Sequence, residues 1–461
     1  MTMQYHSTRG TAPALDFEGA MLAGLARDGG LYVPAEIPVM PRADIAALAG
    51  RPYEEVALRV MQPFTGLSEE RLGDLIGRAY AGFGHDVRAP LVQIAPSHFL
   101  LELFHGPTLA FKDFAMQLIG QLFQDVMRRR GERITIVGAT SGDTGSAAIE
   151  AFRGLDNVEC FILFPRGRVS EVQRRQMTTP SEANVHALSV EGDFDDCQAA
   201  VKAMFADDAF RDRVGLTAVN SINWARVLAQ VVYYFSAAVA LGAPGRSVGF
   251  TVPTGNFGDI FAGYVARSMG LPIDRLVIAT NRNDILHRTF QTGAHLKEGV
   301  QPTISPSMDI QVSSNFERAL YMAYDRDGRA VAQLMEELRA DGGFAISQGA
   351  MGALRDIYAS GRASEEETGA TIRDTYARTG QTICPHTAVG VKVASEIATD
   401  TPMVTLATAH PAKFPDAVEA ATGHRPALPP RMADLFERPE RLTDVPNDLG
   451  RLKSLIDERI A

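Results

Sequence analysis

Cysteine and tryptophan are scarce in this chain. Its 461 residues include three cysteines and one tryptophan. Cys160, Cys197 and Cys384 are far apart, and no two of them form a C-x-x-C pair. We therefore expect neither a disulfide framework nor a zinc site, and no other metal, but buried thiols in a reducing compartment.

Long apolar runs and an excess of positive charge are also missing. The most hydrophobic run, from Val231 to Leu241, is shorter than the roughly 20 apolar residues that a membrane-spanning helix needs. Residues 1–6 lack the apolar core of a signal peptide. The formal net charge is −10, which disfavours nucleic acid and anionic membranes as partners. We therefore expect a cytoplasmic protein that binds neither.

Strands and helices alternate through the middle of the chain. Apolar and β-branched runs predict strands at 134–137, 158–164, 185–190, 216–219, 248–252 and 276–280, with helical periodicity between them. This alternation predicts an α/β fold built on parallel sheets that helices cover. Residues 1–90 are predicted to be mostly helical, with Ser68 as the N-cap of a helix over 68–83.

One lysine lies at the join between a turn and a helix. Gly106-Pro107 breaks the preceding chain, and apolar residues then recur at helical spacing from Phe111 to Val126, before a capping glycine at Gly131. Partial burial and the positive end of a helix both lower the pKa of a lysine, and only the neutral amine is a nucleophile. Lys112 is thus a Schiff-base lysine or a solvent-exposed first-turn lysine, and this segment alone leaves both open.

Two glycine-rich loops each join a strand to a helix. They are Gly138–Gly145 and Pro253–Asp259. The backbone N–H groups of such loops converge on a helix N-terminus and favour anions, phosphate in particular. The alternative for each is an ordinary tight turn, with Asp143 as a helix cap in the first. In the second, Asp259 must cap the helix or be offset by nearby donors, because a carboxylate repels a phosphate.

A third candidate, Thr408–Phe414, begins where the strand over 404–408 ends. Parallel sheets bind ligands at the carboxyl ends of their strands. The Thr408 hydroxyl suits a ligand ring nitrogen, and His410 and Lys413 are candidate anion contacts or helix caps. A nucleophilic lysine together with several anion-binding strand ends fits pyridoxal 5'-phosphate.

Eight stretches, in order along nearly the whole chain, resemble the threonine synthase family of pyridoxal-phosphate enzymes, which have the type II fold of tryptophan synthase β. They are Tyr5–Gly10, Gly24–Pro34, His105–Met116, Ala139–Gly145, Asn220–Arg226, Pro253–Gly263, Met308–Tyr321 and Thr408–Phe414. The resemblance implies two parallel-sheet α/β domains with the cofactor between them. The Ser-Gly-Asp-Thr form of residues 141–144 resembles the longer microbial and fungal branch of the family.

The resemblance also implies roles for individual residues. Lys112 would form the internal aldimine, and Thr408 would contact the pyridine nitrogen. The cofactor phosphate would be held by Gly255, Asn256, Phe257, Gly258 and Asp259. The substrate carboxylate would be bound by Ser141, Gly142, Asp143 and Thr144.

The implied substrate, O-phospho-L-homoserine, carries a phosphate of its own, so a second basic site is required. Asn223 and Arg226 are three residues apart, on one helix face, and are our first candidates. Lys413 is another. Arg174 and Arg175 are also candidates, and the alternative for that pair is a solvated helix face.

The implied activity is that of a carbon–oxygen lyase in threonine biosynthesis. It converts O-phospho-L-homoserine and water to L-threonine and phosphate by γ-elimination and β-addition of water. The alternatives are another lyase of this fold, such as a serine/threonine dehydratase, and a non-catalytic binder of phosphorylated ligands.

The chain is expected to have three parts. Residues 1–90 form an N-terminal mostly helical domain, and residues 131–244 form a small α/β substrate domain. Residues 91–130 and 245–461 form a large cofactor-binding α/β domain. The sequence leaves open whether the protein is a monomer or a homodimer.

Overall fold

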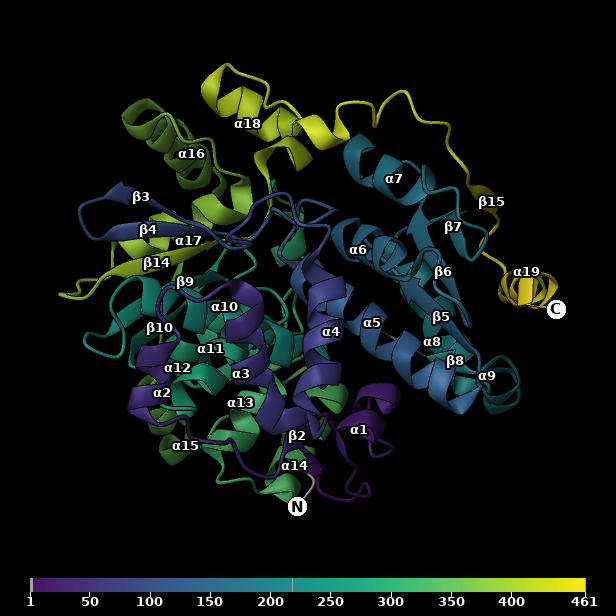
Figure 1. The fold of residues 1–461 in the computed structure, drawn as a ribbon, viewed down its shortest axis with the longest axis horizontal. Helices are drawn as coiled ribbons and strands as arrows, with labels where there is room; N and C mark the ends of the chain where they lie inside the picture. Colours follow the sequence, from purple (N-terminus) through teal and green to yellow (C-terminus); the bar gives the residue numbers. More distant parts are fainter. Residues whose placement is uncertain (1–2, 218, 461) are drawn as a thin grey trace.

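Two sheets of mainly parallel strands organise the chain (Figure 1). The computed structural model describes residues 3–217 and 219–460. The larger sheet has six strands, which are, in order across the sheet, β13 (Tyr358–Arg362), β10 (Ile273–Thr280), β9 (Val248–Pro253), β14 (Met403–Ala407), β4 (His98–Glu102) and β3 (Leu91–Ala95). All neighbours are parallel except β3, which is antiparallel to β4.

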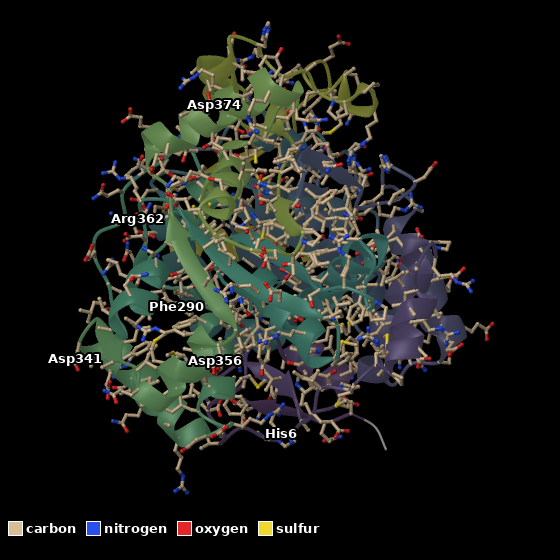
Figure 2. All side chains as sticks on the ribbon, turned by 90° about the vertical axis from the view of Figure 1, so that its left-hand side faces the viewer. His6, Phe290, Asp341, Asp356, Arg362 and Asp374 are labelled. Atoms are coloured by element: carbon tan, nitrogen blue, oxygen red, sulfur yellow. The ribbon has the colours of Figure 1, made fainter. Side chains whose placement is uncertain are left out.

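Strand β13 forms one edge of this sheet. Figure 2 views the molecule from the left-hand side of Figure 1, with Asp356 just before the beginning of β13 and Arg362 at its end. The register pairs Leu276 with Tyr358 and Thr280 with Arg362. The sequence pattern did not indicate this strand, because Ser360 and Gly361 interrupt its apolar character.

The smaller sheet has five strands and is parallel throughout. In order they are β15 (Thr443–Val445), β7 (Val185–Val190), β6 (Val158–Pro165), β5 (Ile134–Ala139) and β8 (Leu216–Thr217). The predicted parallel α/β architecture is confirmed. Residue 218, in the strand predicted over 216–219, lies outside the described residues.

The C-terminal segment crosses from the larger sheet to the smaller one. Figure 1 shows it in yellow, running over the top of the molecule from α18 (Pro415–Thr422) to β15 and α19 (Leu449–Ile460). Strand β15 pairs with β7. The sequence analysis assigns all of 245–461, this segment included, to the large domain. The domain boundaries stay a prediction.

The N-terminal region consists of four helices and a two-stranded antiparallel ribbon. Its elements are β1 (Tyr5–Ser7), α1 (Phe17–Ala23), β2 (Tyr32–Pro34), α2 (Arg42–Ala47), α3 (Tyr53–Thr65) and α4 (Glu69–Tyr80). The predicted cap of α4 is confirmed, because the Ser68 hydroxyl accepts a hydrogen bond from the Arg71 N–H at 3.3 Å.

Helices cover both sheets. Those between β4 and β13 are α5 (Lys112–Arg130), α6 (Asp143–Phe152), α7 (Glu171–Thr178), α8 (Phe194–Ala206), α9 (Asp208–Val214), α10 (Trp224–Ala240), α11 (Gly258–Ser268), α12 (Ile285–Thr292), α13 (Phe316–Ala323), α14 (Gly328–Ala340) and α15 (Gln348–Arg355). The ribbon of β11 (Ala294–Leu296) and β12 (Gly343–Ala345) lies among them. The helices α16 (Glu365–Thr379) and α17 (Pro385–Ser395) follow β13.

Helix α10 lies at the centre of the main core. It is apolar on nearly every face and packs on α3, α5 and α11, as a helix that is hydrophobic all round must. None of the helices in the described ranges is long and apolar enough to cross a bilayer.

Helices α5 and α6 pack closely at Gly120. A Cβ there would lie 2.4 Å from the backbone oxygen of Ala151, so Gly120→Ala must push the helices apart. We expect a loss of about 1–3 kcal/mol in unfolding free energy, measured by urea denaturation. The matched change Gly369→Ala, inside α16 with open space around it, should instead stabilise by about 0.5–1 kcal/mol. Equal effects of the two changes would contradict this packing argument.

Candidate active site

Lys112 is the first residue of α5, and its side chain is only 12% exposed. The predicted helix and its cap are confirmed, since α5 ends at Gly131 with a φ of 66°. Burial lowers the pKa of Lys112, Asp143 raises it, and the nearby Lys413 and Arg226 lower it further. The interpretation of Lys112 as a solvent-exposed lysine is therefore wrong, and the amine has the lowered pKa that a nucleophile needs.

A short antiparallel contact joins the start of α5 to the end of β14. Ala110 pairs with Ala409, the Phe111 N–H donates to the Thr408 oxygen at 2.8 Å, and the His410 N–H donates to the Leu109 oxygen at 3.0 Å. The contact holds the Lys112 segment against the carboxyl end of a central strand, where parallel sheets place their ligands.

Thr408 is buried, and its hydroxyl has no hydrogen-bond partner in the described residues. That hydroxyl is available to a ligand beside Lys112. His410, by contrast, acts as a cap, because its Nδ1 accepts the Ala412 N–H at 3.1 Å. Of the two interpretations for His410, the structure therefore supports the helix cap.

The Asp143 carboxylate lies between two lysines. Its Oδ2 is 3.6 Å from the Lys112 Nζ, and its Oδ1 is 2.8 Å from the Lys413 Nζ. Gln173 also donates to Oδ1, at 2.9 Å. Burial alone would raise the pKa of Asp143, but the two lysines and Gln173 hold it well below the usual range. Asp143 is therefore ionised at the first residue of α6, where the helix dipole also favours a negative charge.

In the rest of the first loop, Gly138–Gly145, some backbone N–H groups already donate to an acceptor within the protein. The Thr140 hydroxyl accepts from the N–H groups of Gly142 and Gly145, both at 2.9 Å. A Cβ on Gly142 would lie 2.3 Å from the Gln173 side chain. Ser141 is exposed and Thr144 half-buried, so the remaining donors that face outward are at these two positions. The sequence predicted a substrate-carboxylate site over 141–144, which stays a prediction.

The second loop presents free donors. The N–H groups of its five residues donate to no acceptor in the described part of the chain: Gly255, Asn256, Phe257, Gly258 and Asp259. Two carbonyl groups of the loop are held by hydrogen bonds from the protein. The Gly255 oxygen accepts from the Ser313 hydroxyl at 2.6 Å, and the Asn256 oxygen accepts from the Asn315 N–H at 2.9 Å. Phe257 has a φ of 63°, which turns consecutive N–H groups toward one side. This donor set, at the N-terminus of α11, fits a phosphate.

The Asp259 side chain does not oppose a phosphate in that loop. Its Oδ1 accepts from the hydroxyls of Tyr233 and Tyr234 on α10, the latter at 3.2 Å. Burial raises the pKa of Asp259 to about 7, so the group is partly neutral near neutral pH. These two tyrosines are the nearby donors that offset a carboxylate beside the expected phosphate.

Arg226 is a buried guanidinium with few partners. It is 4% exposed, donates to the Val219 oxygen at 3.2 Å, and has no described carboxylate among the groups that shift its pKa. Its Nε is buried without a hydrogen-bond partner, and burial lowers the pKa of the group to about 10. A buried cation in this state is costly unless an anion joins it.

Asn223 serves as the N-cap of α10. Its Oδ1 accepts from the Ala225 N–H at 3.0 Å, and its Nδ2 donates to the Met21 oxygen at 2.8 Å. Both ends of the side chain are thus used inside the protein, which differs from the substrate contact that the sequence predicts. Arg174 and Arg175 each pair with Glu440 of the C-terminal segment, so both already have a carboxylate partner within the protein.

Three comparisons with known proteins bear on this site. Family models match residues 4–80 (threonine synthase N terminus), 87–341 (pyridoxal-phosphate dependent enzyme) and 387–456 (threonine synthase, C-terminal). A threonine synthase of Pseudomonas aeruginosa is 54% identical over 99% of this chain and 98% of its own length.

Solved structures agree. The chain superposes on pyridoxal-phosphate-bound threonine synthase from Brucella melitensis with a TM-score of 0.98 and 57% identity, over 99% of both chains. On threonine synthase from yeast the TM-score is 0.94 and the identity 39%, over 99% of this chain and 98% of that one.

The second loop leaves no room for a side chain at its first glycine. A Cβ on Gly255 would lie 2.6 Å from the backbone oxygen of Ser307. We expect Gly255→Ala to displace the free N–H groups and to weaken pyridoxal phosphate binding about tenfold or more, since hydrogen bonds to charged groups contribute about 1.5–3 kcal/mol each. Equilibrium dialysis measures this affinity. Gly349→Ala in α15, where a Cβ meets nothing within 4 Å, is the control and should leave it unchanged. Equal affinities in both variants would contradict the predicted role of this loop.

Proposed function

The chain belongs to the threonine synthase family of pyridoxal-phosphate-dependent enzymes, and we propose that it converts O-phospho-L-homoserine and water to L-threonine and phosphate. We assign Lys112 as the residue that holds the cofactor covalently. The cofactor phosphate is assigned to the N–H groups of Gly255–Asp259, and its ring nitrogen to the Thr408 hydroxyl.

The proposal rests on a second group, besides the loop over 255–259, that is suited to binding an anion. The N–H groups of the loop over 255–259 suit one phosphate, and the buried Arg226 guanidinium, on which no described carboxylate acts, suits another. Arg226 also lies close enough to lower the pKa of Lys112. A dehydratase acting on serine or threonine needs only the first of these sites. A substrate that carries its own phosphate needs both.

When bound, pyridoxal phosphate supplies an electron sink for the electrons released at the substrate carbons. The chain supplies the remaining parts. Lys112, with its lowered pKa, takes up and returns protons at its Nζ. Thr408 offers a hydroxyl and no negative charge, so nothing at that position promotes protonation of the ring nitrogen. Arg226 holds the phosphate that leaves from Cγ, and the N-terminus of α6 orients the substrate carboxylate.

Two finer points also stay predictions. The sequence leaves open a monomer or a homodimer. A cytoplasmic location is expected from the sequence.

The proposed reaction releases inorganic phosphate from O-phospho-L-homoserine. We expect the purified chain to produce phosphate and L-threonine in equal amounts, and Lys112→Ala to abolish both together with the near-visible absorbance band of the bound cofactor. Lys392→Ala removes a lysine from a carboxylate cluster with Glu367 and Glu396 and should leave both intact. Faster release of ammonia and a keto acid from threonine would indicate a dehydratase. Absence of the band in the unaltered chain would indicate a non-catalytic binder.

The lone buried cation gives a second prediction. We expect Arg226→Met to raise KM for O-phospho-L-homoserine roughly ten- to hundredfold, because a hydrogen bond to a charged group contributes about 1.5–3 kcal/mol. The same change removes an uncompensated buried charge, so the substrate-free protein should melt at a higher temperature. A purely structural arginine would give the reverse, a lower melting temperature with an unchanged KM for the folded fraction.

A further inference from the structure

One buried carboxylate lies between two lysines, and the two contacts are unequal. Lys413 contacts Oδ1 of Asp143 at 2.8 Å, within hydrogen-bond distance. Lys112 is 3.6 Å from Oδ2, beyond it. Only one of the two lysine side chains is therefore within hydrogen-bond distance of Asp143.

Lys413 has the acceptors that an ammonium group requires. Besides Asp143, its Nζ donates to the backbone oxygen of Thr108 at 2.8 Å, and its side chain is fully buried. Asp113, whose carboxyl accepts both the N–H and the hydroxyl of Thr108, is close enough for Lys413 to lower its pKa, against the larger raising effect of burial. Lys112 has no such set of acceptors among the described residues. A buried positive charge is therefore more costly on Lys112 than on Lys413.

The other groups that face Lys112 do not reverse this preference. Arg226, from α10, adds a second positive charge, which disfavours an ammonium at Lys112. His386, from α17, has its pKa lowered to about 4 by burial, so it is neutral at physiological pH. Among the described residues, Asp143 is thus the carboxylate that pairs with Lys112, and Lys413 already occupies one of its oxygens.

We propose that Lys413 is a positioning residue that holds Asp143 away from Lys112, so that Lys112 is the lysine left as a free amine for the cofactor. The inference rests on the proposed function, which assigns Lys112 as the covalent link. In the step concerned, the Lys112 nitrogen attacks the aldehyde carbon of pyridoxal phosphate. A carbon–nitrogen double bond forms, and the aldehyde oxygen leaves as water with the two protons of the amine.

Without Lys413, Asp143 would pair with Lys112 alone. Loss of the positive charge at 413 and gain of the carboxylate both favour the ammonium form of Lys112, so its pKa should rise. Replacement of Asp143 by asparagine acts in the opposite direction, because it removes the carboxylate that favours the ammonium. The two single changes are therefore expected to shift Lys112 in opposite directions.

The test follows the rate at which the cofactor-stripped full chain regains its near-visible band on addition of pyridoxal phosphate, between pH 6 and about 10. We expect the midpoint of that pH profile to move up by about one unit in Lys413→Met, which lowers the rate at neutral pH about tenfold. It should move down in Asp143→Asn and lie near the wild-type value in the double variant. Lys392→Met, in a lysine–carboxylate cluster away from the site, should leave the profile unchanged.

The outcomes separate this inference from the proposed function. If the unaltered chain forms no band, or Lys112→Ala keeps it, the proposed function fails. If the band forms through Lys112 but the midpoint of Lys413→Met stays or falls, the role of Lys413 is overturned. A Lys413 that matters only for folding would lower the yield and melting temperature with no shift. Should Lys413→Met not fold, a midpoint that rises or stays in Asp143→Asn overturns the proposal equally.

Discussion

The short contact between residues 109–111 and 408–410 is the constraint on which the site depends. It is made of two backbone hydrogen bonds and one bridge, and it joins the segment before α5 to the end of β14. Since Lys112 begins α5, the contact sets the distance from its amine to Thr408 and to Lys413 on the following turn. A helix supplies a rigid mount for a catalytic group, and here a central strand fixes the position of that mount.

A buried arginine, Arg318, holds the second loop in place. Arg318 donates to the backbone oxygens of Tyr32 and Ile222 and to the Asn315 side chain, while Asn315 donates to the oxygen of Asn256. One guanidinium thus connects the N-terminal ribbon and the start of α10 to the loop that we assign to the cofactor phosphate. This network explains how that loop keeps its N–H groups turned toward one side. The carbonyl groups are held by the protein, and the donors remain for the ligand.

The sequence was sufficient for features that depend on local pattern. The helix at Lys112 with its glycine cap, the two loops between strands and helices, and the parallel sheets all follow from spacing and residue type, and the structure confirms them. It was insufficient where a role is decided by a distant partner. Asp259 is bonded by tyrosines of another helix, and Lys413 is paired with Asp143 across most of the chain. The short strand β15 shows no pattern of its own and depends on its neighbour β7.

Two arginines of similar burial illustrate why composition alone cannot assign function. Arg318 has acceptors for its donors and therefore contributes to the architecture. Arg226 has one weak acceptor and an unpartnered Nε, so in the protein alone its burial is a net cost. Folding tolerates such a group only when the rest of the core is stable enough, and the cost is recovered when an anion binds. The same reasoning applies to Lys112, whose amine is buried with an incomplete set of acceptors. For Arg226 and Lys112, incomplete pairing inside the fold is therefore what supports assigning them to the ligand-binding site.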